Sequence, residues 1–219
     1  MDDAVVPSSF KNSSLDADTR LLVRLSAAIA GADEQVTRRV IDEVVGAVSP
    51  DLVDEVILQS YLFAGFPRTL NAARMWRSAS GVSAPPADDS ASFRHAPEWE
   101  TRGEETCSLV YGEFYAPLRR NVRQLHPALE GWMITDGYGK VLGRPGLDLK
   151  RRELCVVAAC AAAGQQRQLH SHLHGALNCG ASPEDVYATL DAVSDLVAEA
   201  NRGRYKTLLT RVVANRHVR

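Results

Sequence analysis

Glu153 and His172 are the two residues whose types and surroundings best suit proton-transfer chemistry. The segment after Glu153 runs Leu-Cys-Val-Val-Ala-Ala, and His172 lies nineteen residues beyond the glutamate. Because that segment is apolar on every face of a helix, we expect the Glu153 carboxylate to be buried. A buried carboxylate either finds a partner or has its pKa raised until it is neutral, and such an acid beside a histidine can relay protons near neutral pH. Both residues are therefore candidates for proton transfer.

A purely structural role for the same two residues stays open. Glu153 could pair instead with Arg151, with Arg152 or with the start of a helix. His172 could equally be a core histidine that is held by a hydrogen bond. The catalytic interpretation requires the two side chains to lie close together, whereas these structural alternatives do not.

Two further histidines lie on the same predicted helix as His172. His170 and His174 share one helical face, while His172 points roughly the opposite way. Their spacing is that of a metal-binding pair, but two ligands are too few for a protein metal site and no third is evident nearby. The sequence therefore predicts no metal site.

Four residues are candidates for contact with a substrate: Arg144, Gln168, Trp132 and Tyr138. Arg144 can bind an anionic group through two hydrogen bonds, or it can be a turn residue before the helix. Trp132 and Tyr138 can line a pocket or serve as packing anchors. The glycine-rich segment 136–143 lacks the spacing and the Ser/Thr of a phosphate-binding loop, so we expect a plain turn there.

Composition places the chain among ordinary globular proteins. It has 219 residues, 45% hydrophobic and 24% charged, with a formal net charge of −2. That net charge gives no indication of binding to nucleic acid or to an anionic membrane surface. There is no run of about 18 apolar residues and the acidic start does not resemble a secretory signal, so the expected location is the cytoplasm. The expected partners are a small-molecule substrate and no nucleic acid or membrane.

The cysteines have no pattern of a redox or metal motif. They stand at positions 107, 155, 160 and 179, and no two are separated by two residues. Buried thiols of this kind behave as small hydrophobic groups. We therefore expect reduced, structural cysteines.

The periodic segments of the chain predict an all-α fold. Leucine and alanine dominate them, and alternating β-branched residues are scarce. The expected helices cover residues 17–30, 34–46, 50–63, 67–76, 105–123, 148–163, 165–178, 183–198 and 202–214.

The helices fall into two groups that look like copies of one unit, packed together. Gly46 and Gly180 can each end a helix in the left-handed conformation, and Ser49 and Ser182 can each cap the next helix. Chance similarity between alanine-rich helices is the alternative. The predicted organisation is a degenerate first repeat at 1–76, a small, polar, proline-rich linker at 77–104, and a second repeat with the candidate site at 105–219.

The second repeat resembles the carboxymuconolactone decarboxylase family, which includes the alkylhydroperoxidase-D proteins. The resemblance covers about two-thirds of the chain. It is carried by Glu153-Leu154 and the apolar helix, Gly164, His172-Leu173-His174-Gly175-Ala176-Leu177-Asn178, Gly180, Ser182-Pro183-Glu184 and, in the first half, Tyr61-Leu62-Phe63-Ala64-Gly65-Phe66-Pro67. It implies an all-α fold that assembles into homo-oligomers, trimers or hexamers, and needs no cofactor.

The resemblance also distinguishes two branches of the family. The peroxidase branch uses a glutamate, a Cys-x-x-Cys pair and a histidine four residues later, and the two cysteine positions fall here on Gln165 and Gln168. Glutamine can neither attack a peroxide nor resolve a sulfenic acid. In the first repeat, Arg20 and Arg38 fall near the glutamate and histidine positions, so that copy looks structural.

What remains implies a lyase of the decarboxylase branch. The expected activity is cofactor-independent decarboxylation or proton transfer on a small lactone or related carboxylic acid, with Glu153 and His172 as the catalytic residues. The alternative is a non-catalytic ligand-binding or assembly protein of the same fold. A thiol peroxidase is the weakest interpretation because the family's thiols are missing.

Overall fold

The computed structural model describes residues 15–217, and within this range the chain forms helices and no strand. The all-α prediction is confirmed. Short 3₁₀ turns join some of the helices. The main elements are α1 (Ala17–Gly31), α2 (Glu34–Val44), α3 (Pro50–Ser80), α4 (Ala96–Tyr111), α5 (Tyr115–Leu125), α6 (Pro127–Trp132), a π-helix (Met133–Leu142), α7 (Leu149–Ala162), α8 (Gln166–Asn178), α9 (Pro183–Ala192) and α10 (Glu199–His217).

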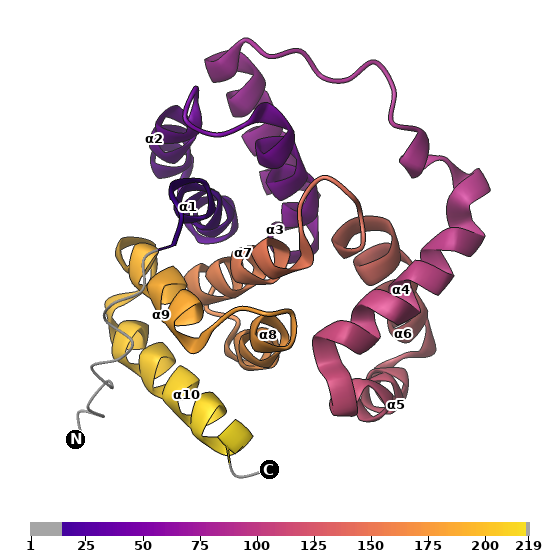
Figure 1. The fold of residues 1–219 in the computed structure, drawn as a ribbon. Helices are drawn as coiled ribbons and strands as arrows, with labels where there is room; N and C mark the ends of the chain where they lie inside the picture. Colours follow the sequence, from indigo (N-terminus) through magenta and orange to yellow (C-terminus); the bar gives the residue numbers. More distant parts are fainter. Residues whose placement is uncertain (1–14, 218–219) are drawn as a thin grey trace.

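Helix α7 lies at the centre of the molecule. In Figure 1, α1, α2 and α3 lie on one side of it, α4 to α6 lie on the other, and α8 and α9 flank it toward α10. Residues 152–161 are all nearly or fully buried, as expected for a helix that is apolar on every face. Side chains of both halves belong to one hydrophobic cluster around it. The two-repeat organisation itself stays a prediction.

The predicted helix ends are confirmed in part. Gly46 and Gly180 have positive φ angles of 74° and 90°, as the helix-ending role requires. Ser182 forms a capping box with Asp185. Ser49 precedes α3 but makes no side-chain capping hydrogen bond, so that part of the prediction is wrong.

The expected linker is shorter in the structure than residues 77–104. Its first residues complete α3, which ends at Ser80, and its last residues form the first half of α4. Helix α4 forms there because Trp99 is buried against the π-helix: a Cβ placed on Gly139 would lie 1.9 Å from the Trp99 carbonyl oxygen. This close approach between distant segments orders residues that look like linker in sequence.

The plain turn expected at 136–143 is also wrong, because most of this segment lies in the π-helix. The expected helix at 105–123 is broken near Gly112, which has a φ of 52°. The expected break between residues 63 and 67 is confirmed, since Gly65 has non-helical angles within α3. Within residues 15–217, no helix is both long and apolar enough to cross a membrane.

Candidate functional site

Glu153 and His172 meet in the interior of the protein. The Nδ1 atom of His172, on α8, lies 2.8 Å from Oε2 of Glu153, on α7. The glutamate is fully buried and the histidine is 5% exposed. The alternative pairings do not occur: Arg151 pairs with acids at the protein surface, and Arg152 pairs with Glu55. The structure therefore brings together the two predicted catalytic residues.

Gly175 allows the two helices to come this close. A Cβ atom at this position would lie 2.5 Å from Oε2 of Glu153 and 2.8 Å from Cγ1 of Val110. Any side chain would have to displace the carboxylate or α4. The sequence comparison placed Gly175 within the family motif, but its role became visible only in the structure.

The two oxygens of the Glu153 carboxylate have different surroundings. Oε2 accepts from His172, whereas Oε1 is buried and has no hydrogen-bond partner among the described residues. With Glu153 ionised, the imidazole proton belongs on Nδ1, and this assignment follows from the hydrogen bond. The other ring nitrogen, Nε2, is then the one available for chemistry.

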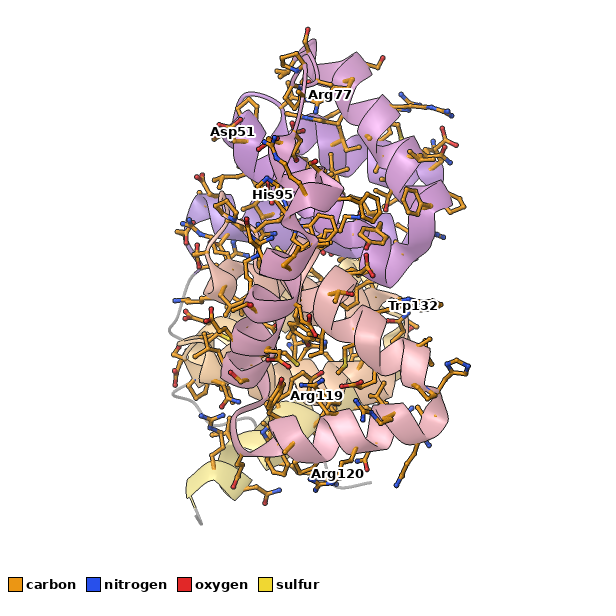
Figure 2. The ribbon with its side chains drawn as sticks, turned by 90° about the vertical axis from the view of Figure 1, so that its right-hand side faces the viewer. Asp51, Arg77, His95, Arg119, Arg120 and Trp132 are labelled. Atoms are coloured by element: carbon orange, nitrogen blue, oxygen red, sulfur yellow. The ribbon has the colours of Figure 1, made fainter. Side chains whose placement is uncertain are left out.

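A cavity of about 500 Å³ lies beside His172. Its size is within the usual range for small-molecule sites. Trp132, at 61% exposure, lies at its outer rim, and Figure 2 shows it at the edge of the molecule where the first-half helices meet the later ones. Lining residues come from five elements, α3, α4, α6, the π-helix and α8: Tyr61, Leu62, Phe63, Tyr111, Leu129, Trp132, Met133, Asp136, Gly137, Tyr138, Leu142 and His172.

Aromatic rings surround the imidazole. Phe63 contacts it edge-on with ring centroids 5.8 Å apart, and Tyr111 lies at 6.3 Å. Tyr138 in turn lies 6.0 Å from Tyr111. Burial raises the pKa of both tyrosines, and for Tyr111 a hydrogen bond with Tyr138 offsets part of the increase. Both hydroxyls therefore stay protonated at neutral pH; Tyr138 donates to Tyr111, and the Tyr111 proton is left to donate to a ligand.

Sequence reasoning missed Tyr111 as a site residue. It ends α4, far from the family motif, and nothing in its own segment marks it as part of a site. Phe63 was noted only as part of the family's pattern in the first half. Both reach His172 because α3 and α4 pack around α7 and α8.

Two of the four predicted substrate contacts lie at this cavity and two do not. Tyr138 and Trp132 line it. Arg144 instead forms ion pairs with Glu55 at 2.9 Å and Asp88 at 3.0 Å, and it is not among the lining residues. Gln168 is exposed on α8 and is also not among the lining residues.

Arg144 belongs to a second buried charged cluster, which links α3 to α7. Fully buried Arg152 donates to Oε2 of Glu55 at 2.6 Å and to Oε1 of Gln59 at 3.3 Å. It also donates to the carbonyl oxygens of Leu147, Arg144 and Pro145. Burial lowers the pKa of Arg152, and Glu55 opposes that effect.

The cysteines lack the properties of reactive thiols. All four are free, and three are fully buried. Burial raises the pKa of each of them to about 12, so the thiolate population at neutral pH is very small. At one peroxidase cysteine position, Gln165 lies 3.8 Å from Cys160 Sγ.

His170 and His174 contact each other, with ring centroids 5.1 Å apart. They lie on the side of α8 that faces Phe114 rather than Glu153. Among the described residues, no group of three or more His, Cys, Asp or Glu side chains is arranged to hold a metal ion.

The fold and the site define an all-helical domain with a buried glutamate–histidine pair beside an aromatic cavity. Residues 128–201 match the model of the Carboxymuconolactone decarboxylase family. The matched range contains Glu153, His172, Trp132 and Tyr138 but not Tyr111.

Two similar proteins bear the same name. The chain is 26% identical over 178 residues to Peroxisomal protein 2 of Schizosaccharomyces pombe, covering 79% of this chain and 82% of that protein. It is 25% identical over 159 residues to Peroxisomal protein 2 of Saccharomyces cerevisiae, covering 61% of this chain and 56% of that protein. The chain thus spans little more than half of the second relative. Neither name states an activity.

Proposed function

We propose that the protein catalyses cofactor-independent decarboxylation or proton transfer on a small lactone or related carboxylic acid. The observation that carries this proposal is the buried hydrogen bond between His172 and Glu153 at the wall of a substrate-sized cavity. A carboxylate that orients an imidazole and an open volume beside that imidazole are the elements that general acid–base catalysis needs.

The histidine supplies the proton that decarboxylation requires. When a carboxylated butenolide loses carbon dioxide, the C–C bond breaks and its electron pair delocalises through the unsaturated lactone. Protonated His172 then gives the proton on Nε2 to carbon, while Glu153 holds Nδ1 and stabilises the imidazolium. Water or the next substrate restores the proton.

The two buried tyrosines suit the other half of the reaction. Charge that develops on the lactone oxygen needs hydrogen-bond donors that are already in place. Tyr138 and Tyr111 line the cavity, and burial keeps their hydroxyls protonated. We assign them to the oxygen-centred charge in place of Arg144, which is held by Glu55 and Asp88.

A ligand-binding protein without turnover is the second candidate. The observation that favours it is the position of Arg144, because the cation expected to hold an anionic substrate is not at the cavity. A thiol peroxidase has no comparable support, since all four thiols have raised pKa values.

Location and assembly stay predictions. The sequence favours the cytoplasm, whereas the names of the two relatives favour the peroxisome. Imaging of a fluorescent fusion against markers of both compartments separates the two. The expected homo-oligomer is checked by light scattering on the purified protein.

The function is tested by following carbon dioxide release and ultraviolet absorbance with 4-carboxymuconolactone and with a butenolide that carries a single carboxylate. We expect His172→Ala to lower turnover by about 10²- to 10⁴-fold. The matched control is His170→Ala, two positions away on the same helix and exposed, which we expect to keep normal turnover. Equal turnover in both variants would contradict the proposal.

A variant with all four cysteines changed to serine tests the remaining alternative. Under the proposed mechanism it keeps its turnover if it folds, because no thiol takes part in the reaction. Peroxide consumption by the wild type that disappears in this variant would instead support the peroxidase interpretation.

A further inference from the structure

The cavity beside His172 has an unusual distribution of charge for a site that would bind a dicarboxylate. In the described part of the chain, no lysine or arginine lines this cavity, and Asp136 is its sole lining carboxylate. Glu153 lies just behind His172 and adds a second acid close by. Even with His172 protonated, as the proposed mechanism requires, these two carboxylates leave the summed side-chain charge around the ligand negative.

Two described cations close to these segments, Lys140 and Arg119, do not line the cavity. Lys140 lies 3.9 Å from a carboxylate oxygen of Asp136, but its ammonium group stacks over the Trp99 ring at 5.0 Å and is not part of the lining. Arg119 is paired with buried Glu130. Figure 2 shows Arg119 well away from Trp132 on the same face of the molecule.

The walls of the cavity suit a flat, apolar group. Tyr61, Phe63 and Trp132 contribute aromatic rings, and Leu129 and Met133 contribute aliphatic surface. Burial of an anion without a cation or a set of donors carries a large desolvation penalty. Each additional carboxylate on the ligand adds that penalty and is also repelled by Asp136.

Loss of carbon dioxide changes this balance in favour of the reaction. The departing carboxylate is a localised charge in an apolar site, and its electron pair becomes a delocalised charge that Tyr111 and Tyr138 can stabilise. The apolar walls therefore favour the reaction for the one carboxylate that leaves, but they penalise a second carboxylate that remains.

We propose that the substrate is an unsaturated lactone, or a related carbonyl compound, with a single carboxylate and an apolar substituent, and that the site discriminates against dicarboxylates. This inference rests on the proposed function, because the single carboxylate is the group that leaves. The bond that breaks joins that carboxylate to the ring, and the proton that replaces it comes from His172.

Calorimetric titration at low salt tests the charge preference without any turnover. The probes are two saturated phenyl-substituted lactone acids, one with a single carboxylate and one with a second carboxylate on the phenyl ring. Because they lack the ring double bond, they cannot delocalise the charge and do not decarboxylate. We expect the Kd of the monoacid to be at least about 10-fold lower than that of the diacid.

Two arginine variants locate the effect. Leu129→Arg places a cation at the cavity and should narrow the preference or reverse it. Leu58→Arg, at a similarly exposed leucine outside the cavity, is the control and should bind both probes as the wild type does. An unchanged preference in Leu129→Arg would overturn the inference, and so would tighter binding of the diacid or no binding of either probe to the wild type.

Turnover of the matching unsaturated acids separates this inference from the proposed function. Tighter binding of the monoacid without any His172-dependent turnover would contradict the proposed function and leave the charge preference standing. His172-dependent turnover together with tighter binding of the diacid would support the proposed function and contradict the charge preference.

Discussion

Two buried glutamates of this protein have opposite surroundings. Glu55 binds both Arg144 and Arg152, and Arg152 is further held by Gln59 and by backbone carbonyls. Among the described residues, Glu153 binds a single histidine and its other oxygen has no hydrogen-bond partner. The first cluster joins α3 to α7, whereas the second lies at the wall of a cavity.

The difference shows that burial alone does not identify a catalytic carboxylate. Both carboxylates are buried and both have a nitrogen partner, but one cluster is closed by hydrogen bonds on nearly every side and the other is open toward a substrate-sized volume. A closed cluster has no group left to react, so its role is to hold the helices together. An incompletely satisfied acid beside a histidine and a cavity is what a catalytic site requires.

The same isosteric substitution at both glutamates is the strongest test of this contrast. Glu55→Gln leaves buried Arg152 without its counter-charge and leaves Arg144 with Asp88 alone, and we expect it to lower the free energy of unfolding by about 3–5 kcal/mol. Glu153→Gln can still accept a hydrogen bond from His172 and removes a buried charge, so its change should stay below about 1 kcal/mol. Urea denaturation measures both. Equal losses would show that the two clusters are alike.

The glycine that allows the catalytic pair to form provides the second test. Gly175→Ala forces a methyl group against the Glu153 carboxylate and Val110, and we expect a stability loss of about 1–3 kcal/mol together with weakened activity. Gly203→Ala in α10 is the control, since a Cβ there meets nothing within 4 Å. It should stabilise the protein by about 0.5–1 kcal/mol. A harmless Gly175→Ala would mean that α8 can move away without consequence.

The smallest expected effect concerns Asp88, at the edge of the cluster that Glu55, Arg144 and Arg152 form. A hydrogen bond from Ser90 lowers the pKa of Asp88, and Arg144 adds to the effect while partial burial opposes it. Because the pKa is depressed in the folded state, this stabilisation is present above the ordinary value of 3.8 and is lost as the pH falls through the folded pKa.

Asp88→Asn should therefore reduce the acid sensitivity of unfolding, at a cost below about 1 kcal/mol at pH 7 for so exposed a pair. Asp51→Asn, at an exposed acid at the start of α3 (Figure 2), is the control. Thermal unfolding followed from pH 2 to pH 7 checks both. Identical acid profiles for the wild type and Asp88→Asn would contradict the assignment.

Most of the helices could be predicted because periodicity and end signals are local. The helices that carry Glu153 and His172 begin and end within a few residues of their expected bounds. The segments that were misjudged lie at 77–104 and 136–143, where small and polar residues resemble a linker and a turn. Residues 96–104 and 136–142 are helical because α4 and the π-helix pack closely through Gly103 and Gly139, a contact between distant segments.

The candidate site, like the fold, was predictable in part from the sequence. Glu153 and His172 lie on neighbouring helices in sequence, and the spacing that the family resemblance implies indicated a pair. Arg144 was also a sound candidate for an anion site by residue type. Its actual partner, Glu55, lies 89 residues away in sequence, and no local pattern connects the two.

The amino-acid sequence alone determined an all-helical protein and a buried helix around Glu153, because hydrophobic periodicity is a property of short segments, and it indicated His172 as one candidate partner. The tertiary structure decided which side chains share the cavity. It brought Tyr111 and Phe63 to His172 and directed Arg144 to Glu55. Those contacts depend on how separate helices pack around α7, and packing between distant segments leaves no periodic signal in the chain.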